Sequence, residues 1–364
     1  MAKTVEMAKV SMRGGFHVFW GLAVSTIISA VGVVFLARLL TPAELGLVTV
    51  AWVAPNLLQN FRNWGINSAM IKYTAQYRAE GNIGNLKNII LAGWFFELLM
   101  GVLLSLILYL LSGYLATSVF NRPELEPLLQ VISFTVFTGA LLITAQSVFT
   151  GFERMEFYSF TLIARALFKA VLAPLMVIFG FGVLGVIVGS TAGLLIAGVL
   201  SVGIMYFAIR KRFQKPSDEK PSFTADLKSM LKYGLPLSIT TILLGVRTQF
   251  FNFLLAIYVS DALIGNYQVA LNFSVLISFF SMPILTVLFP AFSKLNAEKE
   301  TETVKRIFQF SVKLSAFLVV PAAALIIALS VPAISTLFGV QYEFAPLYLA
   351  LNAVSYLFSA FGNL

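Results

Sequence analysis

Few residues of this sequence could carry covalent chemistry. The chain has no cysteine and one histidine, His17, so it lacks thiol nucleophiles and has almost nothing from which to build a histidine metal site. A phosphate-binding loop of the GxxxxGK[ST] pattern is also absent. The carboxylates outside the apolar segments are too scattered to form an acid–base or metal-binding cluster; they include Glu44, Glu124, Glu126, Asp261 and Glu343. We therefore predict a protein that is not an enzyme and that needs no metal and no cofactor.

The distinctive side chains are charges that fall inside apolar segments. Arg165 and Lys169 are four residues apart, so they share one face of a helix. Arg247 lies deep in a later apolar segment, and Arg62 lies near the end of an early one. An ionised side chain is costly in a bilayer, so it usually faces a cavity or a partner. Because arginine binds phosphate oxygens in a bidentate manner, these four residues predict a basic cavity for an anionic head group.

Another interpretation of the same charges is structural. Glu97 is the only acidic residue in any apolar segment, and it could pair with Arg165 or Lys169. Arg62 would then lie among the lipid headgroups. We expect Glu97 to be a charge partner rather than a site for a coupling ion.

The segments that must position these charges are membrane spans. Of the 364 residues, 59% are hydrophobic and 11% are charged, far from the composition of a soluble domain. A bilayer core needs about 20 mostly apolar residues per helix. On that rule the chain is an all-α polytopic membrane protein of about ten spans, near 16–37, 45–66, 88–111, 128–150, 157–179, 183–209, 233–259, 264–290, 307–330 and 345–363.

The basic residues outside the spans predict the orientation. The net charge of +9 would suggest nucleic acid in a soluble protein, but here it follows the excess of Lys and Arg that marks cytoplasmic loops. Only Arg38 and Arg122 fall in loops of the opposite side. We predict a multi-pass protein of the cytoplasmic membrane, with both termini in the cytoplasm and with no nucleic-acid partner.

The spans divide into two similar halves. Residues 41–51 can be set against residues 260–270, and each segment joins a first span to a second one. We expect an N-terminal six-helix bundle over 1–210, a cytoplasmic linker over 211–232 and a C-terminal bundle over 233–364. Phe223, Leu227 and Leu231 predict a short amphipathic helix in the linker that lies on the inner membrane surface, although a plain solvated linker is also compatible. The second bundle has only four spans, so we expect a chain that is truncated relative to a complete repeat. Duplicated bundles usually enclose a central transport site.

Several segments resemble the polysaccharide flippase branch of the multidrug/oligosaccharidyl-lipid/polysaccharide exporter superfamily. They are residues 35–46, 64–69, 233–236 and 288–295, and the first is the most specific. The resemblance implies two pseudo-symmetric helix bundles around a central cavity. It also implies a flippase that moves a polyprenyl-(pyro)phosphate-linked oligosaccharide to the outer leaflet for surface polysaccharide assembly. Implied partners are this lipid-linked oligosaccharide, the membrane lipids, and functionally linked glycosyltransferases and a polymerase.

Two other functions are compatible with the sequence. The first is a cation-coupled drug or metabolite antiporter of the same superfamily. Such a protein would need carboxylates inside the membrane, whereas the spans here hold one carboxylate against several basic groups. The second is a membrane glycosyltransferase acting on polyprenyl-linked sugars, which would need an acidic cluster in the outer loops.

Overall fold

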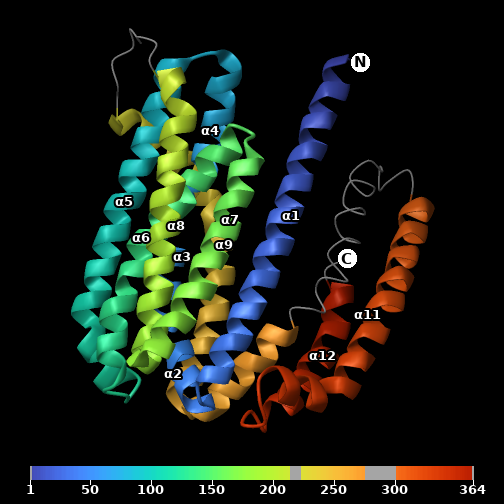
Figure 1. The fold of residues 1–364 in the computed structure, drawn as a ribbon. Helices are drawn as coiled ribbons and strands as arrows, with labels where there is room; N and C mark the ends of the chain where they lie inside the picture. Colours follow the sequence, from blue (N-terminus) through green and yellow to red (C-terminus); the bar gives the residue numbers. More distant parts are fainter. Residues whose placement is uncertain (1, 214–222, 275–300, 363–364) are drawn as a thin grey trace. The chain divides into compact units, whose positions relative to one another are not determined.

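The computed structural model describes residues 2–213, 223–274 and 301–362, and those residues are helical with short connections (Figure 1). The helices are α1 (Ala2–Leu39), α2 (Pro42–Ala51), α3 (Val53–Arg62), α4 (Ile66–Glu80), α5 (Ile83–Tyr114), α6 (Leu125–Gly151), α7 (Met155–Met176), α8 (Gly182–Phe213), α9 (Phe223–Tyr258), α11 (Thr301–Leu337) and α12 (Ala345–Gly362). Two π-helical turns, η1 (Leu115–Val119) and η2 (Val177–Phe181), follow α5 and α7. Residues 261–274 are also helical.

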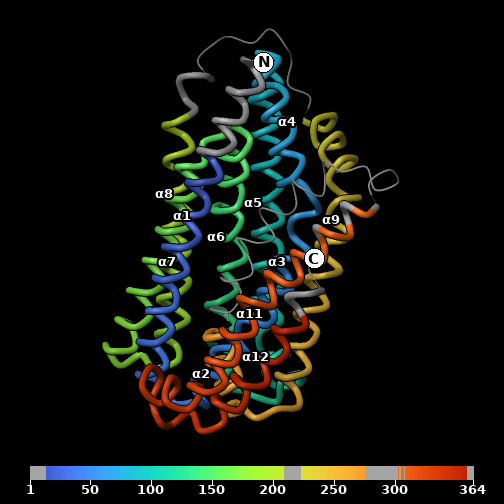
Figure 2. The backbone as a smooth tube through the Cα atoms, turned by 90° about the vertical axis from the view of Figure 1, so that its right-hand side faces the viewer, coloured from blue at the N-terminus to red at the C-terminus, as the bar shows by residue number. Residues whose placement is uncertain are grey.

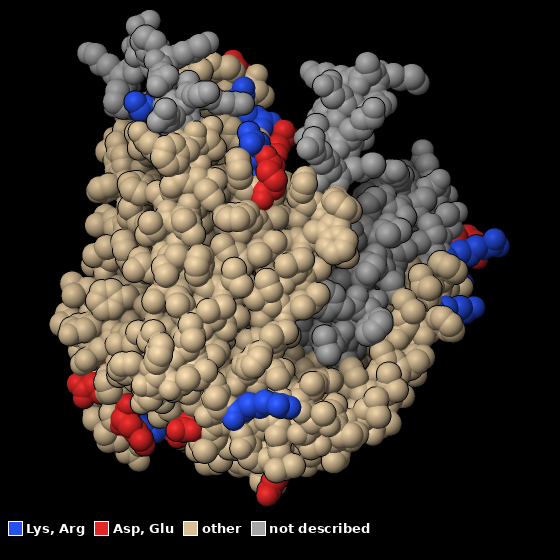
Figure 3. Space-filling view, in the orientation of Figure 1, with Lys and Arg blue, Asp and Glu red and all other residues tan. Residues whose placement is uncertain are grey.

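The all-helical membrane fold predicted from composition is confirmed. Six helical stretches of the described residues are long and apolar enough to cross a membrane, and a shorter apolar helix covers 345–358. One of these stretches, 155–208, takes in both the fifth and the sixth expected spans. The eighth expected span, 264–290, lies largely outside the described residues. On the first unit in Figure 3, charged side chains gather at the two ends of the helices and leave an uncharged band between them.

The second expected span, 45–66, is not one helix. It is divided between α2 and α3, which have ten residues each, and α4 follows after Gly65. Pro55 has no N–H, so the helical hydrogen bond to the carbonyl of Ala51 cannot form, and the helix breaks at Trp52. The second break uses Gly65, whose φ of 76° is a left-handed conformation that suits glycine.

The chain forms two compact units. The first contains residues 1–39 and 47–259, and the second contains residues 40–46 and 260–364. The first unit therefore includes α9, and Figures 1 and 2 show α9 running beside α3. The expected amphipathic segment from Phe223 is continuous with the rest of α9, which has no break at Pro236. Leu227 and Leu231 pack against a core of α4, α5 and α6 residues instead of forming a separate surface helix.

Within the first unit, polar contacts join the helix ends that spans of alternating direction would place on the same side of the membrane. Arg78, at the end of α4, forms an ion pair with Glu153, just after α6. Arg122, just before α6, donates from its guanidinium to the carbonyl oxygens of Ala256 and Val259 at the end of α9. Arg122 thus satisfies carbonyls that a helix terminus leaves without intrahelical partners, which accounts for one of the two basic residues in the expected outer loops.

The second unit brings the two matched segments together. A methyl group at Gly46 would lie 1.8 Å from the carbonyl oxygen of Asp261, and one at Gly265 would lie 1.9 Å from that of Pro42. Gly46 and Gly265 occupy equivalent positions in the match, as do Pro42 and Asp261, so the two contacts are reciprocal. Each glycine allows a backbone approach that any side chain would prevent. This reciprocity is the geometry expected of two repeats related by a local two-fold axis.

The remainder of the second unit is held by a short polar cluster and by packing of α11 on α12. Asn266 accepts hydrogen bonds from the N–H groups of Phe344 and Ala345 through its Oδ1, at 3.0 Å each, and so caps the start of α12. The side chains of Gln341 and Tyr342 donate to the carbonyl oxygen of Leu40. Residues 40–46 are thereby fixed to the unit that contains the second repeat.

Candidate functional site

One face of α7 carries two cationic side chains. Arg165 and Lys169 are one turn apart, and both side chains are exposed on the surface of the first unit. Leu167 is also exposed but lies two residues from each of them, on the opposite side of the helix because each residue turns it by about 100°. The face of Leu167 also carries Phe160 and Val171 and is apolar, as a lipid-facing surface should be. The structure therefore separates the charged face of α7 from its apolar face.

The charged face of α7 meets the break between α2 and α3. The ammonium nitrogen of Lys169 lies 5.2 Å from the centre of the Trp52 ring, a cation–π contact. The backbone N–H of Trp52 is shared between the carbonyl oxygens of Val48 and Thr49, at 3.3 and 3.2 Å, so Trp52 occupies the last turn of α2. Interrupted helices are where transporters commonly place binding groups. Trp52 was not among the residues selected from the sequence, although Pro55, three residues later, was a detectable signal.

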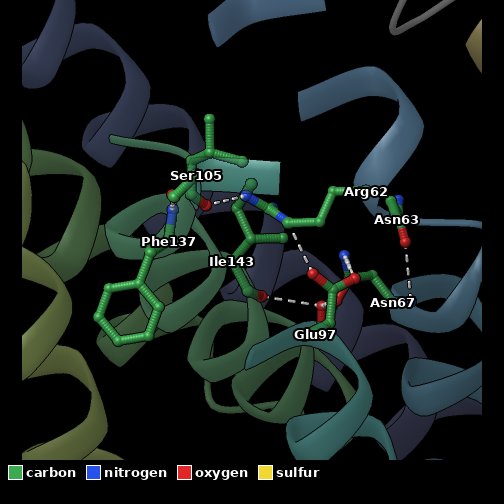
Figure 4. A network of polar contacts seen from close by, with 9 residues as sticks. Arg62, Asn63, Asn67, Glu97, Ser105, Phe137 and Ile143 are labelled. Atoms are coloured by element: carbon green, nitrogen blue, oxygen red, sulfur yellow. Dashed lines mark hydrogen bonds and ion pairs between the residues drawn. The ribbon is translucent and has the colours of Figure 1, made fainter. Parts of the chain in front are cut away.

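Arg62 and Glu97 form a buried ion pair inside the first unit (Figure 4). The Nε of Arg62 donates to Oε2 of Glu97 at 2.8 Å, and its Nη1 donates to the carbonyl oxygen of Val136 at 2.8 Å. The Nδ2 of Asn67 donates to the other carboxylate oxygen at 3.0 Å, and Asn67 in turn accepts from the hydroxyl of Ser147. Arg62 is 1% exposed and Glu97 is 0% exposed. Helices α3, α4 and α5 each supply one member of this network, and α6 supplies two, Val136 and Ser147.

The pairing of Glu97 differs from both alternatives drawn from the sequence. Its partner is Arg62 rather than Arg165 or Lys169, and the Arg62 side chain is buried among helices of the first unit. Both carboxylate oxygens and two guanidinium nitrogens have partners, which a buried charge pair needs in order to offset its desolvation. In this arrangement Arg62 and Glu97 join four helices of the bundle, α3, α4, α5 and α6.

Arg247 lies on α9, away from the other charged residues. Gly245 of α9 faces α3, since a methyl group there would lie 2.5 Å from the side chain of Asn60. Arg247 is two residues further along the helix, so it points away from α3, and its side chain is exposed. The structure thus brings Arg165 and Lys169 together, pairs Arg62 with Glu97, and places Arg247 apart from both groups on the side of α9 that the first unit leaves open.

Comparisons with known proteins agree on one family and one fold. A family model described as "Polysaccharide biosynthesis protein" matches residues 35–345. An uncharacterised membrane protein of Methanocaldococcus jannaschii is 23% identical over 329 residues, which are 83% of this chain and 63% of the relative. The lipopolysaccharide biosynthesis protein WzxC of Escherichia coli is 26% identical over 296 residues, which are 77% of this chain and 54% of WzxC. This chain therefore spans less than two thirds of the length of these curated relatives.

Solved structures with the same fold are transporters. An inward-facing MATE family multidrug resistance transporter of the MOP superfamily aligns with a TM-score of 0.69 at 16% identity, over 93% of this chain and 81% of that one. A MOP superfamily transporter from Pyrococcus furiosus, described by the reverse polarity of its binding pocket, aligns with a TM-score of 0.60 at 17% identity, over 98% and 82%. At these identities the similarity establishes the fold.

Proposed function

This chain belongs to the polysaccharide biosynthesis protein family, and we propose that it moves a polyprenyl-(pyro)phosphate-linked oligosaccharide from the cytoplasmic leaflet to the outer leaflet. The observation that carries the proposal is the cationic face of α7, which is exposed yet lies opposite the apolar face of the same helix. A membrane-embedded face with two cations suits an anionic cargo. The phosphate of a lipid-linked sugar is such a cargo.

Three basic side chains hold the phosphate in this proposal. Arg165 and Lys169 act together from α7, and Arg247 contributes from the open side of α9. Arg supplies a planar pair of donors that keeps its charge at any working pH, and Lys supplies a compact point charge. Arg62, in contrast, uses its guanidinium for Glu97 and Val136, so we assign it the role of holding the bundle together. The polyprenyl tail stays among the lipids.

Alternating access supplies the movement. The two matched segments, around Gly46 and Gly265, contact each other within the second unit. In this proposal the duplicated bundles that follow them move against each other. The head group enters from the cytoplasmic side, and movement of one half against the other exposes it outside. Sugars and lipid remain covalently unchanged, so the proposed partners are enzymes that build the cargo before transport and polymerise it afterwards.

A cation-coupled antiporter is less compatible with these observations. Such a protein needs a carboxylate that is free to bind a cation inside the membrane. The carboxylate that the first unit places among its helices, Glu97, has both oxygens occupied by Arg62 and Asn67. A glycosyltransferase would need clustered carboxylates, and no group of three His, Cys, Asp or Glu side chains occurs among the described residues.

The test is a flipping assay in liposomes that contain the purified 364-residue chain. A prenyl-pyrophosphate-linked N-acetylglucosamine is placed in the inner leaflet, and a membrane-impermeant lectin reports its arrival outside. We expect the double variant Arg165→Gln/Arg247→Gln to lose transport while inserting normally. Lys313→Gln, at a basic residue near the expected end of a span, is the matched control and should transport at the wild-type rate. Unchanged transport by the double variant overturns the site assignment, and no transport above protein-free liposomes overturns the function.

A further inference from the structure

A row of polar side chains on α3 extends from Trp52. At about 100° per residue, one sector of roughly 100° of the helix circumference contains Trp52 and four carboxamide residues, Asn56, Gln59, Asn60 and Asn63. All four are half-buried, although carboxamides are uncommon in a membrane segment because each unpaired group costs free energy there. Their presence on one face needs a reason.

Two of these carboxamides form a hydrogen bond within the protein, and a third packs against a neighbouring helix. Asn60 donates to the carbonyl oxygen of Asn56 and faces Gly245 of α9. Asn63 accepts from the backbone N–H of Asn67 through its Oδ1. The side-chain oxygen of Gln59 lies against α6, where a methyl group at Gly139 would be 3.3 Å away. Packing between helices therefore accounts for Gln59, Asn60 and Asn63, the part of the row furthest from Trp52.

The Asn56 and Gln59 carboxamides form no hydrogen bond with any residue that the structure describes. Gln59 lies against α6, whereas Asn56 lies one helical turn from Trp52. The row therefore begins with an aromatic ring and a carboxamide that internal packing does not explain. Lys169 of α7 contacts the Trp52 ring, and Asn56 lies one helical turn further along the chain.

We propose that Trp52 and Asn56 form the sugar subsite of the phosphate-binding face, so that Trp52 stacks on the first pyranose ring and Asn56 binds its hydroxyl groups. This inference rests on the proposed function. In a glycosyl phosphate the first sugar is joined directly to the phosphate, so a phosphate on Lys169 brings that sugar to Trp52. An indole ring offers a rigid apolar surface to the C–H face of a pyranose. A carboxamide can both donate to and accept from the hydroxyls at the edge of the ring.

The proposal separates two kinds of recognition. Lys169 and Arg165 bind the phosphate whether or not a sugar is attached, while Trp52 and Asn56 contribute only when the sugar is present. Because the cation lies over the ring, the two subsites are adjacent and a single ligand can occupy both. Affinity for the lipid pyrophosphate and discrimination of its sugar are therefore carried by different helices.

The test compares three probes on the detergent-solubilised 364-residue chain. One is a short-chain prenyl pyrophosphate, and the others are the same lipid bearing N-acetylglucosamine or galactose. We expect Trp52→Leu to weaken binding of at least one sugar-bearing probe by about tenfold and to leave the sugar-free probe within about threefold. Trp52→Phe keeps an aromatic surface and should recover most of the loss. Lys169→Gln should weaken all probes to a similar degree.

Two further variants keep the result interpretable. Trp20→Leu removes a tryptophan that is 52% exposed on α1 and should leave every affinity unchanged. Asn56→Leu should lower affinity for the sugar-bearing probe alone, and it tests the subsite even if Trp52→Leu fails to fold. Equal weakening of all probes by Trp52→Leu, or wild-type affinities that do not depend on the sugar, would overturn the sugar subsite and leave the flippase proposal standing. Failure of the liposome assay above would overturn the flippase itself.

Discussion

Removal of the Glu97 carboxylate is the perturbation that the structure makes most informative. Glu97 is fully buried and receives hydrogen bonds from Arg62 at 2.8 Å and Asn67 at 3.0 Å. In Glu97→Gln the arginine stays buried without a counter-charge, and the new amide presents a donor where both neighbours donate. Breaking a buried ion pair costs about 3–5 kcal/mol of unfolding free energy. That corresponds to a folding constant lower by roughly 10²- to 10³·⁵-fold.

The assay is equilibrium unfolding of the purified protein in mixed micelles, followed by tryptophan fluorescence. Trp64 packs edge-to-face on Phe96, the residue before Glu97, and so provides a local reporter. The double variant Arg62→Met/Glu97→Leu removes both charges and fills the space with apolar groups, so most of the lost stability should return. A loss below about 1 kcal/mol in Glu97→Gln would refute the reasoning, because an ion pair that costs so little to break is solvated.

The same double variant distinguishes the two roles considered for Arg62. If Arg62 only joins helices, the stable double variant should flip the lipid-linked sugar at close to the wild-type rate. A double variant that folds well but does not transport would show instead that Arg62 contacts the cargo, as the sequence first suggested.

Three other changes have definite expected outcomes. Gly65→Ala should lower the thermal unfolding temperature more than Gly81→Ala. Both glycines have a left-handed φ, 76° and 71°, so the backbone strain of the two variants is similar. A methyl group at Gly65 would lie 2.0 Å from a backbone oxygen of α9, whereas one at Gly81 would meet open space. Arg122→Ala removes the donors to the last carbonyls of α9, so amide hydrogen exchange in the final turn of α9 should accelerate while exchange in α5 stays unchanged. Because the chain has no cysteine, a single introduced cysteine reports on which side of the membrane it lies. A membrane-impermeant maleimide should label Glu124→Cys in intact cells and Glu80→Cys only after permeabilisation. The opposite result would reverse the predicted orientation.

The sequence predicted the class of fold correctly, while the placing of charges inside the membrane stays a prediction. Apolar runs identify spans because each must satisfy its backbone hydrogen bonds within itself, which is a local requirement. The match of residues 41–51 to 260–270 also had a structural counterpart, the reciprocal contacts of Gly46 and Gly265. A helix beginning near Phe223 was expected from its apolar spacing, but as a short helix on the membrane surface; it is instead part of α9, and Leu227 and Leu231 pack on protein.

The partners of the charges were not predictable in this way. Glu97 could pair with any cation at a similar depth, and the choice of Arg62, 35 residues away in sequence, depends on which helices pack together. Trp52 was overlooked because an aromatic residue in an apolar run is ordinary, and only the approach of Lys169 gives it a distinctive environment.

The amino-acid order alone therefore determined that this chain is a bundle of membrane helices with cations inside it, since burial in a bilayer acts on each segment separately. The tertiary structure decided which cations are neutralised and which remain exposed. That outcome depends on distances between helices, and no property of a single segment encodes them.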